Sequence, residues 1–167
     1  MPREPKLPFD PIERASELWT THIGDPTSMR LATSIMRVQQ LIIAELDAVL
    51  KPYGITFARY EVLALLSFSA TGRLPLSKIG ERLMVHPTSV TNAMDRLEAQ
   101  GLVKRVADRT DRRRTLAELT AQGKDVLGQA TEKIMGIDFA VKGLDAAEQD
   151  ATYELLRSLR LSAGDFD

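Results

Sequence analysis

The chain has 167 residues, with 22 Lys and Arg against 23 Asp and Glu, so its formal net charge is −1. Hydrophobic residues at 44% and charged residues at 27% are ordinary for a globular protein, which excludes a wholly disordered chain and a polybasic chain that binds any polyanion. The length suffices for one domain with a core, with or without a helical dimerisation arm. The sequence contains no cysteine, which excludes a disulfide framework, a thiolate metal site, a cysteine nucleophile and a thiol redox sensor.

The sequence carries no sign of a membrane segment or a signal peptide. Its first ten residues contain three prolines and mixed charges instead of an apolar run. The longest apolar stretches, such as Val62–Leu66, are much too short to span a bilayer. We therefore expect a cytoplasmic protein without a membrane partner.

Two helices are predicted in the N-terminal third of the chain. The first runs from Pro11 to about His22, with Asp10 as its N-cap and proline at the first helical position. The second is predicted over residues 28–51, because apolar residues recur there at steps of three and four. Ser28 is expected to cap its start. A second apolar row at steps of seven indicates that this long helix packs against more than one neighbour.

A helix-turn-helix is predicted in the middle of the chain, after a helical stripe over Phe57–Leu66. Apolar spacing marks a helix of about two turns over Leu76–Leu83. The tight connection Met84-Val85-His86 follows, in which His86 is expected at a helix cap. Pro87 opens a further helix that Gly101 ends as a left-handed C-terminal cap.

A β-hairpin is predicted directly after the helix-turn-helix. Two extended pieces, Leu102–Ala107 and about Arg114–Leu119, flank the polar turn-forming segment 108–113. A hairpin in this position is a wing, and arginines at its tip can enter a minor groove.

Two long amphipathic helices are predicted to complete the chain. Thr120 caps the first, which is expected to present Ile134, Ile137 and Val141 on one face. The last helix follows Gly143 and carries an apolar stripe.

The near-zero net charge hides a basic module. Residues 72–114 hold ten Lys and Arg against five Asp and Glu, net +5, so the remaining 12 basic and 18 acidic residues give −6. Electrostatic attraction to phosphate depends on local charge, because screening acts over roughly 8 Å at physiological salt. A charge run alone is equally consistent with a solvated turn. Its position after a helix-turn-helix favours nucleic acid.

The second helix of the motif has a polar face suited to DNA. Val90, Met94 and Leu97 form its buried stripe. The opposite side carries Thr88, Asn92, Asp95, Arg96 and Ala99, with Ser89 and Thr91 on the flanks. The candidate DNA contacts among them are Thr88, Ser89, Thr91, Asn92 and Arg96. Small residues allow a close approach to the major groove, and hydroxyl, amide and guanidinium groups bind base edges or phosphates. Solubilising an exposed helix is the alternative use for any one of them.

The wing tip combines arginines with acids. Asp111 lies between basic residues and is able to accept hydrogen bonds from a guanidinium and hold the tip in one shape. The sequence does not identify its partner.

These motifs closely resemble the multiple-antibiotic-resistance-regulator (MarR) family over about residues 28–160. The most specific are the helix end Arg96-Leu97-Glu98-Ala99-Gln100-Gly101-Leu102-Val103-Lys104-Arg105, the wing pattern Asp108-Arg109-Thr110-Asp111-Arg112-Arg113 and Leu119-Thr120-Ala121-Gln122-Gly123. The resemblance implies a homodimer that represses, or less often activates, at palindromic operators, with small ligands often relieving binding. By position it places Thr88, Ser89, Thr91, Asn92 and Arg96 in the major groove, Arg112 or Arg113 in the minor groove, and Asp111 as the acid that orders the wing.

The expected fold is therefore mainly α with a small β-hairpin wing: a winged helix-turn-helix plus a helical dimerisation region. We divide the chain into an N-terminal extension (1–27), part of a dimerisation helix (28–56), the DNA-binding domain (57–119) and C-terminal dimerisation helices (120–167). We expect a dimeric DNA-binding regulator, most simply a ligand-relieved repressor, without cofactor, metal site or enzymatic activity. The alternative is a winged-helix protein-interaction module without DNA binding. The residues that bind a ligand are not assigned.

Overall fold

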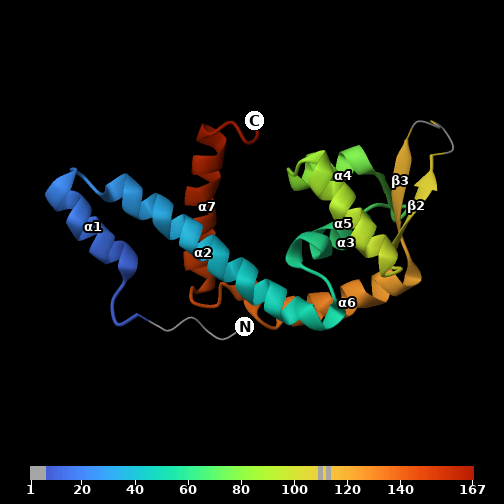
Figure 1. The fold of residues 1–167 in the computed structure, drawn as a ribbon, viewed down its shortest axis with the longest axis horizontal. Helices are drawn as coiled ribbons and strands as arrows, with labels where there is room; N and C mark the ends of the chain where they lie inside the picture. Colours follow the sequence, from blue (N-terminus) through green and yellow to red (C-terminus); the bar gives the residue numbers. More distant parts are fainter. Residues whose placement is uncertain (1–6, 109–110, 112–113) are drawn as a thin grey trace. The chain divides into compact units, whose positions relative to one another are not determined.

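The structure is a computed structural model that describes residues 7–108, 111 and 114–167. Its elements are, in chain order, α1 (Pro11–His22), α2 (Thr27–Leu50), the 3-10 turn η1 (Lys51–Tyr53), α3 (Phe57–Ser67), β1 (Arg73–Pro75), α4 (Leu76–Leu83), α5 (Pro87–Ala99), β2 (Val103–Ala107), β3 (Thr115–Leu119), α6 (Ala121–Met135), η2 (Asp138–Ala140) and α7 (Ala146–Ser162) (Figure 1). The chain divides into two compact units, residues up to Ala44 and Glu45–Asp167. The mainly helical fold with a small sheet agrees with the sequence-based expectation.

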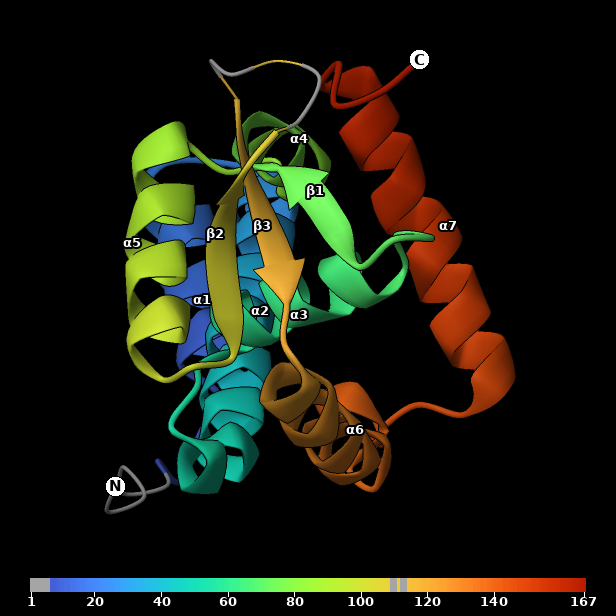
Figure 2. The same cartoon turned by 90° about the vertical axis from the view of Figure 1, so that its right-hand side faces the viewer.

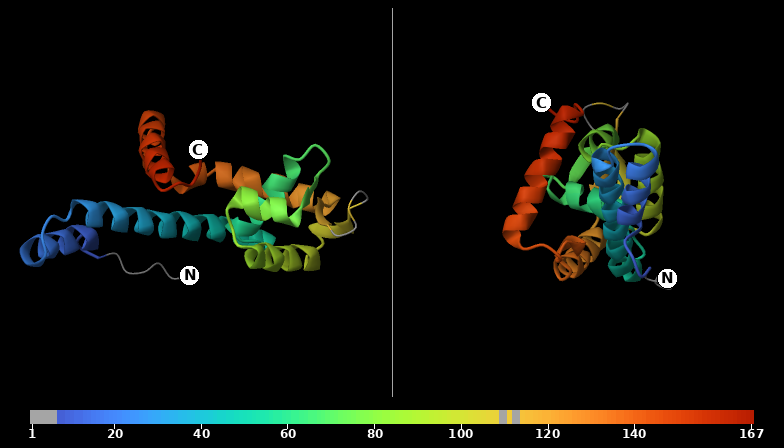
Figure 3. Two further views of the ribbon diagram at one scale, coloured as in Figure 1. Left: turned by 90° about the horizontal axis from the view of Figure 1, so that it is seen from above. Right: turned by 90° about the vertical axis from the view of Figure 1, so that its left-hand side faces the viewer.

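The first unit consists of α1 and most of α2, a long helix that is visible from above in Figure 3. Asp10 Oδ1 accepts a hydrogen bond from the backbone N–H of Ile12 at 2.8 Å, which confirms the predicted N-cap of α1. The predicted cap of α2 at Ser28 is wrong, because the helix already begins at Thr27. The cause is Asp25, whose Oδ1 accepts from Thr27 N at 3.1 Å and Thr27 Oγ1 at 2.7 Å.

The second unit has its hydrophobic core between α3, α4, α5, α6 and the sheet. Helix α3 packs against all of these elements. The largest side chains that are fully buried are Leu46, Leu50, Leu63, Leu66, Ile79, Met94, Leu97, Val103 and Ile134. This arrangement fixes the helix-turn-helix on the sheet.

The sheet has three antiparallel strands in the order β1-β3-β2, so β2 is an edge strand (Figure 2). The predicted hairpin is present as β2–β3. In its observed register, Val103 lies opposite Leu119 and Ala107 lies opposite Thr115. Strand β1 was not predicted. It is only three residues long, too short for a periodic signal, and it exists because it pairs with β3.

Helix α6 ends earlier than predicted. Ile137 and Val141 were expected to continue its apolar face, but the helix stops at Met135 with Gly136 as C-cap. After Ile137, the three residues of η2 have positive φ angles: 48° at Asp138, 50° at Phe139 and 63° at Ala140. Glycine is a poor helix former, and the left-handed residues turn the chain away from the helix axis.

Apolar side chains remain exposed on α2 and α7. Helix α7 has no buried residue, and Leu155 on it is 74% exposed. On α2 the exposed apolar side chains are Leu31, Met36, Val38 and Leu41. Among the helices that the structure describes, none has the length and apolar character needed to cross a bilayer.

Candidate nucleic-acid interface

The helix-turn-helix is held together by a close approach of α4 to α5. A Cβ at Gly80 would lie 3.3 Å from the carbonyl oxygen of Val85 and 3.4 Å from Val90 Cγ2, so glycine brings the two helices near each other. Met84 ends α4 in the left-handed region, with φ 53° and ψ 40°. Its exposed side chain occupies a position that usually favours glycine.

The N-terminus of α5 is capped by a histidine. His86 Nδ1 accepts a hydrogen bond from the backbone N–H of Thr88 at 3.3 Å, which agrees with the expected position of His86 at a helix cap. Pro87 follows at the first helical position. No group of three or more potential metal ligands occurs in the described part of the chain.

Helix α5 has the two faces that its sequence predicts. Val90, Met94 and Leu97 are buried. The five predicted contact residues are all exposed, and we call them the recognition face: Thr88, Ser89, Thr91, Asn92 and Arg96. Within the described residues, Arg96 has no salt-bridge partner, so its guanidinium is available to a ligand.

The base of the wing is fixed to α6 by two carbonyl groups that Thr120 contacts. Gly101 ends α5 with φ 72°, as predicted, and Leu102 follows it. The carbonyl oxygen of Leu102 accepts from Thr120 N at 3.1 Å, and the Thr120 hydroxyl is shared between the carbonyl oxygens of Gly101 at 2.7 Å and Leu102 at 3.0 Å. Thr120 Oγ1 in turn accepts from Gly123 N at 3.0 Å, which confirms Thr120 as the cap of α6. A Cβ at Gly123 would lie 2.0 Å from the carbonyl oxygen of Leu102, which explains the glycine in the Leu-Thr-x-x-Gly motif.

One face of the sheet carries a row of alternating charge. Glu118 on β3 pairs in register with Arg73 on β1 and Lys104 on β2. Its Oε2 lies 2.6 Å from Arg73 Nε, in an ion pair without hydrogen-bond alignment, and its Oε1 lies 2.9 Å from Lys104 Nζ. Lys104 and then Arg73 lower the pKa of Glu118. The single carboxylate of Glu118 therefore offsets one of these two positive charges, and the row keeps a net charge of +1.

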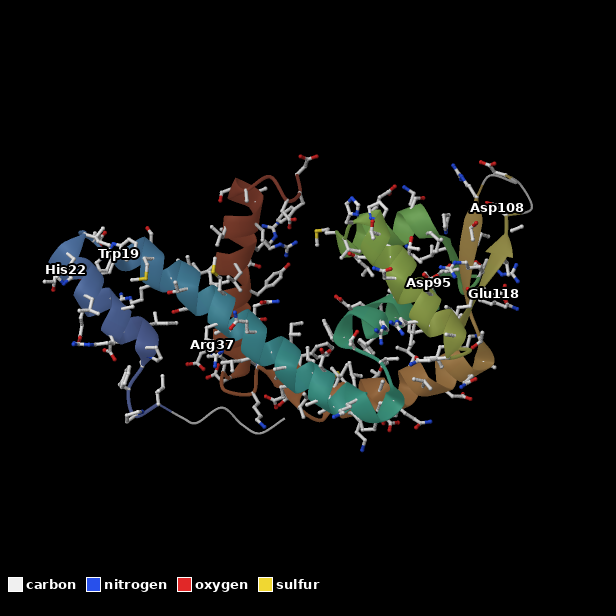
Figure 4. The ribbon with its side chains drawn as sticks, viewed as in Figure 1. Trp19, His22, Arg37, Asp95, Asp108 and Glu118 are labelled. Carbon is white, nitrogen blue, oxygen red and sulfur yellow. The ribbon has the colours of Figure 1, made fainter. Side chains whose placement is uncertain are left out.

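Two carboxylates of α5, those of Asp95 and Glu98, hold Arg105 of β2 against this helix. Arg105 Nη2 lies 2.5 Å from Asp95 Oδ1, and its Nη1 donates to Glu98 Oε2. The backbone N–H of Arg105 also donates to Glu98 Oε1 at 2.9 Å. This backbone bond, followed by the guanidinium, lowers the pKa of Glu98. Figure 4 labels Asp95 on α5 and Glu118 on β3.

The tip of the wing is described only in part. Asp108 N donates to the carbonyl of Arg114 at 3.1 Å, and Arg114 N donates to the carbonyl of Asp111 at 2.9 Å. Asp111 Oδ2 lies 3.4 Å from Arg114 Nε, a partner that the sequence did not identify. The predicted minor-groove residues Arg112 and Arg113 lie outside the described residues.

The sequence predicted the exposed and buried sides of α5 but did not show the internal ion pairs. Lys104 and Arg105 counted as cations of the basic module, yet both have carboxylate partners. The alternation of side chains along β2 was the available signal. Adjacent residues of a strand point to opposite faces of the sheet. Lys104 therefore contacts Glu118 on one face, and Arg105 contacts the acids of α5 on the other.

Comparison with known proteins agrees with this architecture. The sequence profile of the MarR family matches residues 53–114. The HTH-type transcriptional regulator YkoM of Bacillus subtilis is 33% identical over 108 residues, 64% of this chain and 69% of that protein. The crystal structure of Sco5413, a MarR family transcriptional regulator from Streptomyces coelicolor, superposes with a TM-score of 0.78 at 54% identity, over 84% of this chain and 98% of that chain. A mutant MarR from E. coli, solved in complex with operator DNA, gives 0.72 at 27% identity, over 85% of this chain and 97% of that chain. The chain therefore belongs to the MarR family of transcriptional regulators.

Proposed function

We propose that this regulator binds operator DNA through the recognition face of α5. The observation that carries the proposal is the face itself: five exposed polar side chains on the second helix of a helix-turn-helix, beside an exposed acid, Asp95, that is paired with Arg105. Short polar side chains allow the helix to enter a major groove. The related E. coli protein solved on operator DNA supports the same use of the fold.

The residues of the interface have separate roles in this proposal. Thr88, Ser89, Thr91 and Asn92 bind base edges and phosphates at the N-terminal half of α5, where the helix dipole favours an anion. Arg96 reaches the groove one turn later. Arg112 or Arg113 enters the adjacent minor groove. Asp111 orders the tip of the wing, together with Arg114.

We also propose that the protein acts as a homodimer. Residues 28–56 and 120–167 would form the dimerisation region, because the exposed leucines of α7 and the apolar side chains of α2 need a partner to leave water. Two α5 helices in a symmetric dimer read half-sites about 10 bp apart, or a multiple of this distance, on one palindromic operator.

The first test is binding to DNA from the region upstream of the coding sequence. Titration of a fluorescent fragment should give specific binding that weakens with salt, by a slope of about −0.9 per neutralised phosphate. Arg96→Ala should weaken binding about tenfold or more, since one arginine contact to a base is worth about 1–3 kcal/mol. Arg14→Ala, on the exposed surface of α1, is the matched control and should bind like the wild type.

Two results would overturn the proposal. Failure to retard any upstream fragment at low salt would favour a protein-interaction winged helix. Equal affinity of the Arg96→Ala and Arg14→Ala variants would remove the recognition face from the interface.

We propose repression as the sign of regulation and a small molecule as the signal that relieves it. A chain without cysteine has no thiol for an oxidant to modify, so a non-covalent ligand is the simplest signal. Deleting the gene should raise transcription from the bound promoter. A fall in transcription would identify an activator.

A further inference from the structure

We propose that Arg105 is a positioning residue that orients the wing on the recognition helix and does not itself bind phosphate. The proposal rests on the proposed DNA binding. It concerns the group formed by Arg105 with Asp95 and Glu98, which we call the clamp. Asp95 and Glu98 lie on α5, and Arg105 lies on β2, so the clamp joins the two elements expected to enter neighbouring grooves.

The clamp engages both terminal nitrogens and the backbone N–H of Arg105. Its two terminal nitrogens each contact a different carboxylate, and its backbone N–H binds the second oxygen of Glu98. Its side chain is 27% exposed, whereas those of Asp95 and Arg114 are 58% and 64% exposed. A guanidinium flanked by two carboxylates presents no net positive charge to DNA.

The sheet gives this contact its effect on the wing. Strand β2 is the edge of the sheet, and among the described residues its outer N–H groups have no neighbouring strand. Glu98 supplies the acceptor for one of them, at the middle residue of β2. Arg105 lies opposite Ala117, a fully buried residue of β3, so the clamp is on the side of the hairpin that faces the core. Its three contacts fix the angle at which the hairpin leaves α5.

The wing and α5 read the same DNA duplex, so this angle determines whether both fit at once. If the clamp is lost, the hairpin samples other angles and only a fraction of molecules is ready to bind. The apparent dissociation constant then rises by the inverse of that fraction. Non-specific binding depends on phosphate charge and not on simultaneous insertion, so it should change little.

The test compares Arg105→Gln and Arg105→Lys with the wild type and with Arg96→Gln. Lysine keeps the positive charge but is unable to bridge two carboxylates with a planar fork. We expect both Arg105 variants to lose about three- to tenfold in operator affinity if the competent fraction falls to about one third to one tenth. The slope of log affinity against log salt and the affinity for unrelated DNA should stay unchanged. Arg96→Gln serves as the control for a side chain that contacts DNA directly.

A phosphate contact at Arg105 would give a different pattern. Arg105→Lys would then keep most of the affinity, while Arg105→Gln would make the salt slope shallower by about 0.9 for each lost phosphate, or about 1.8 for a dimer. That outcome would refute the clamp. Wild-type operator affinity in both Arg105 variants would also refute it.

Amide hydrogen exchange tests the clamp without DNA. The Arg105 amide should exchange slowly in the wild type and at least tenfold faster in a Glu98→Ala variant, whereas the Val106 amide, on the next residue of β2, provides the reference for the intact hairpin. Equal exchange of Arg105 in both proteins would overturn the clamp. If the amide is protected but no operator is bound, the proposed function fails and the clamp remains as a structural contact.

Discussion

Gly123 lies where the first turn of α6 meets the backbone of Leu102, and its replacement by alanine should destabilise the protein. The added Cβ would stand 2.0 Å from the carbonyl oxygen of Leu102 and 2.8 Å from Leu119 Cδ1. Cβ atoms essentially never approach other heavy atoms within 3.0 Å, so α6 or the carbonyl must move by about 1 Å. The carbonyl accepts from the backbone N–H of Thr120 and shares the Thr120 hydroxyl with the Gly101 carbonyl, so moving it loosens the helix cap.

The size of the effect follows from three contributions. Overpacking costs about 1–3 kcal/mol. Weakening the Thr120 cap adds about 1 kcal/mol, and the better helix propensity of alanine returns about 1 kcal/mol. The net loss is about 2 kcal/mol. For a chain of this size it corresponds to a fall in Tm of about 4–8 °C.

The assay is thermal and urea unfolding followed by circular dichroism, at equal protein concentrations because dimer stability depends on concentration. Gly128→Ala is the control in the same helix, since its Cβ would meet no atom within 4 Å. It should raise stability by about 0.5–1 kcal/mol. A Gly123→Ala protein as stable as the wild type, with Gly128→Ala behaving as expected, would refute the steric argument.

Three further predictions test other parts of the structure. Met84→Gly should raise the free energy of unfolding by about 0.5–1 kcal/mol, because glycine adopts the left-handed conformation without the cost that a side chain incurs. Urea unfolding measures this change, and a lower stability would contradict backbone strain at Met84. The ion pairs that lower the pKa of Glu118 stabilise the protein above about pH 4.5, the ordinary glutamate value, and this stability is lost as the pH falls through the lowered pKa. Burial raises the pKa of Glu61, so Glu61→Gln should stabilise the protein at pH 7, and this gain should vanish as the pH falls through the raised pKa. Urea unfolding of Glu118→Gln and Glu61→Gln across pH 3–8 should therefore show opposite effects at neutral pH, and equal effects would contradict the assignment. Leu155→Glu should shift the dimer toward monomer in sedimentation experiments, and an unchanged dimer mass would exclude this part of α7 from the proposed interface.

Features set by a few neighbouring residues were predictable from the sequence. The caps at Asp10, His86 and Thr120 and the left-handed end at Gly101 depend on one side chain or one φ angle, and each has the expected geometry. The buried stripe of α5 follows from helical periodicity in the same way.

Features that depend on distant partners were not predictable. Strand β1 requires β3, which lies more than 40 residues later in the chain. By charge alone, Lys104 and Arg105 were cations available to DNA. The sequence does not show that Glu118 and Glu98 lie beside them in the folded protein. The early end of α6 depends on left-handed residues that periodicity does not register.

The edge position of β2 has a consequence for solubility as well as for recognition. An exposed edge strand is a template on which a strand of another molecule can pair, and proteins commonly protect such edges with charge. In this chain the carboxylate of Glu98 occupies a backbone N–H in the middle of the edge, and the Arg105 side chain lies over the same stretch. The contact that joins the wing to α5 thus also obstructs intermolecular strand pairing, and a variant without Glu98 would expose an aggregation-prone edge.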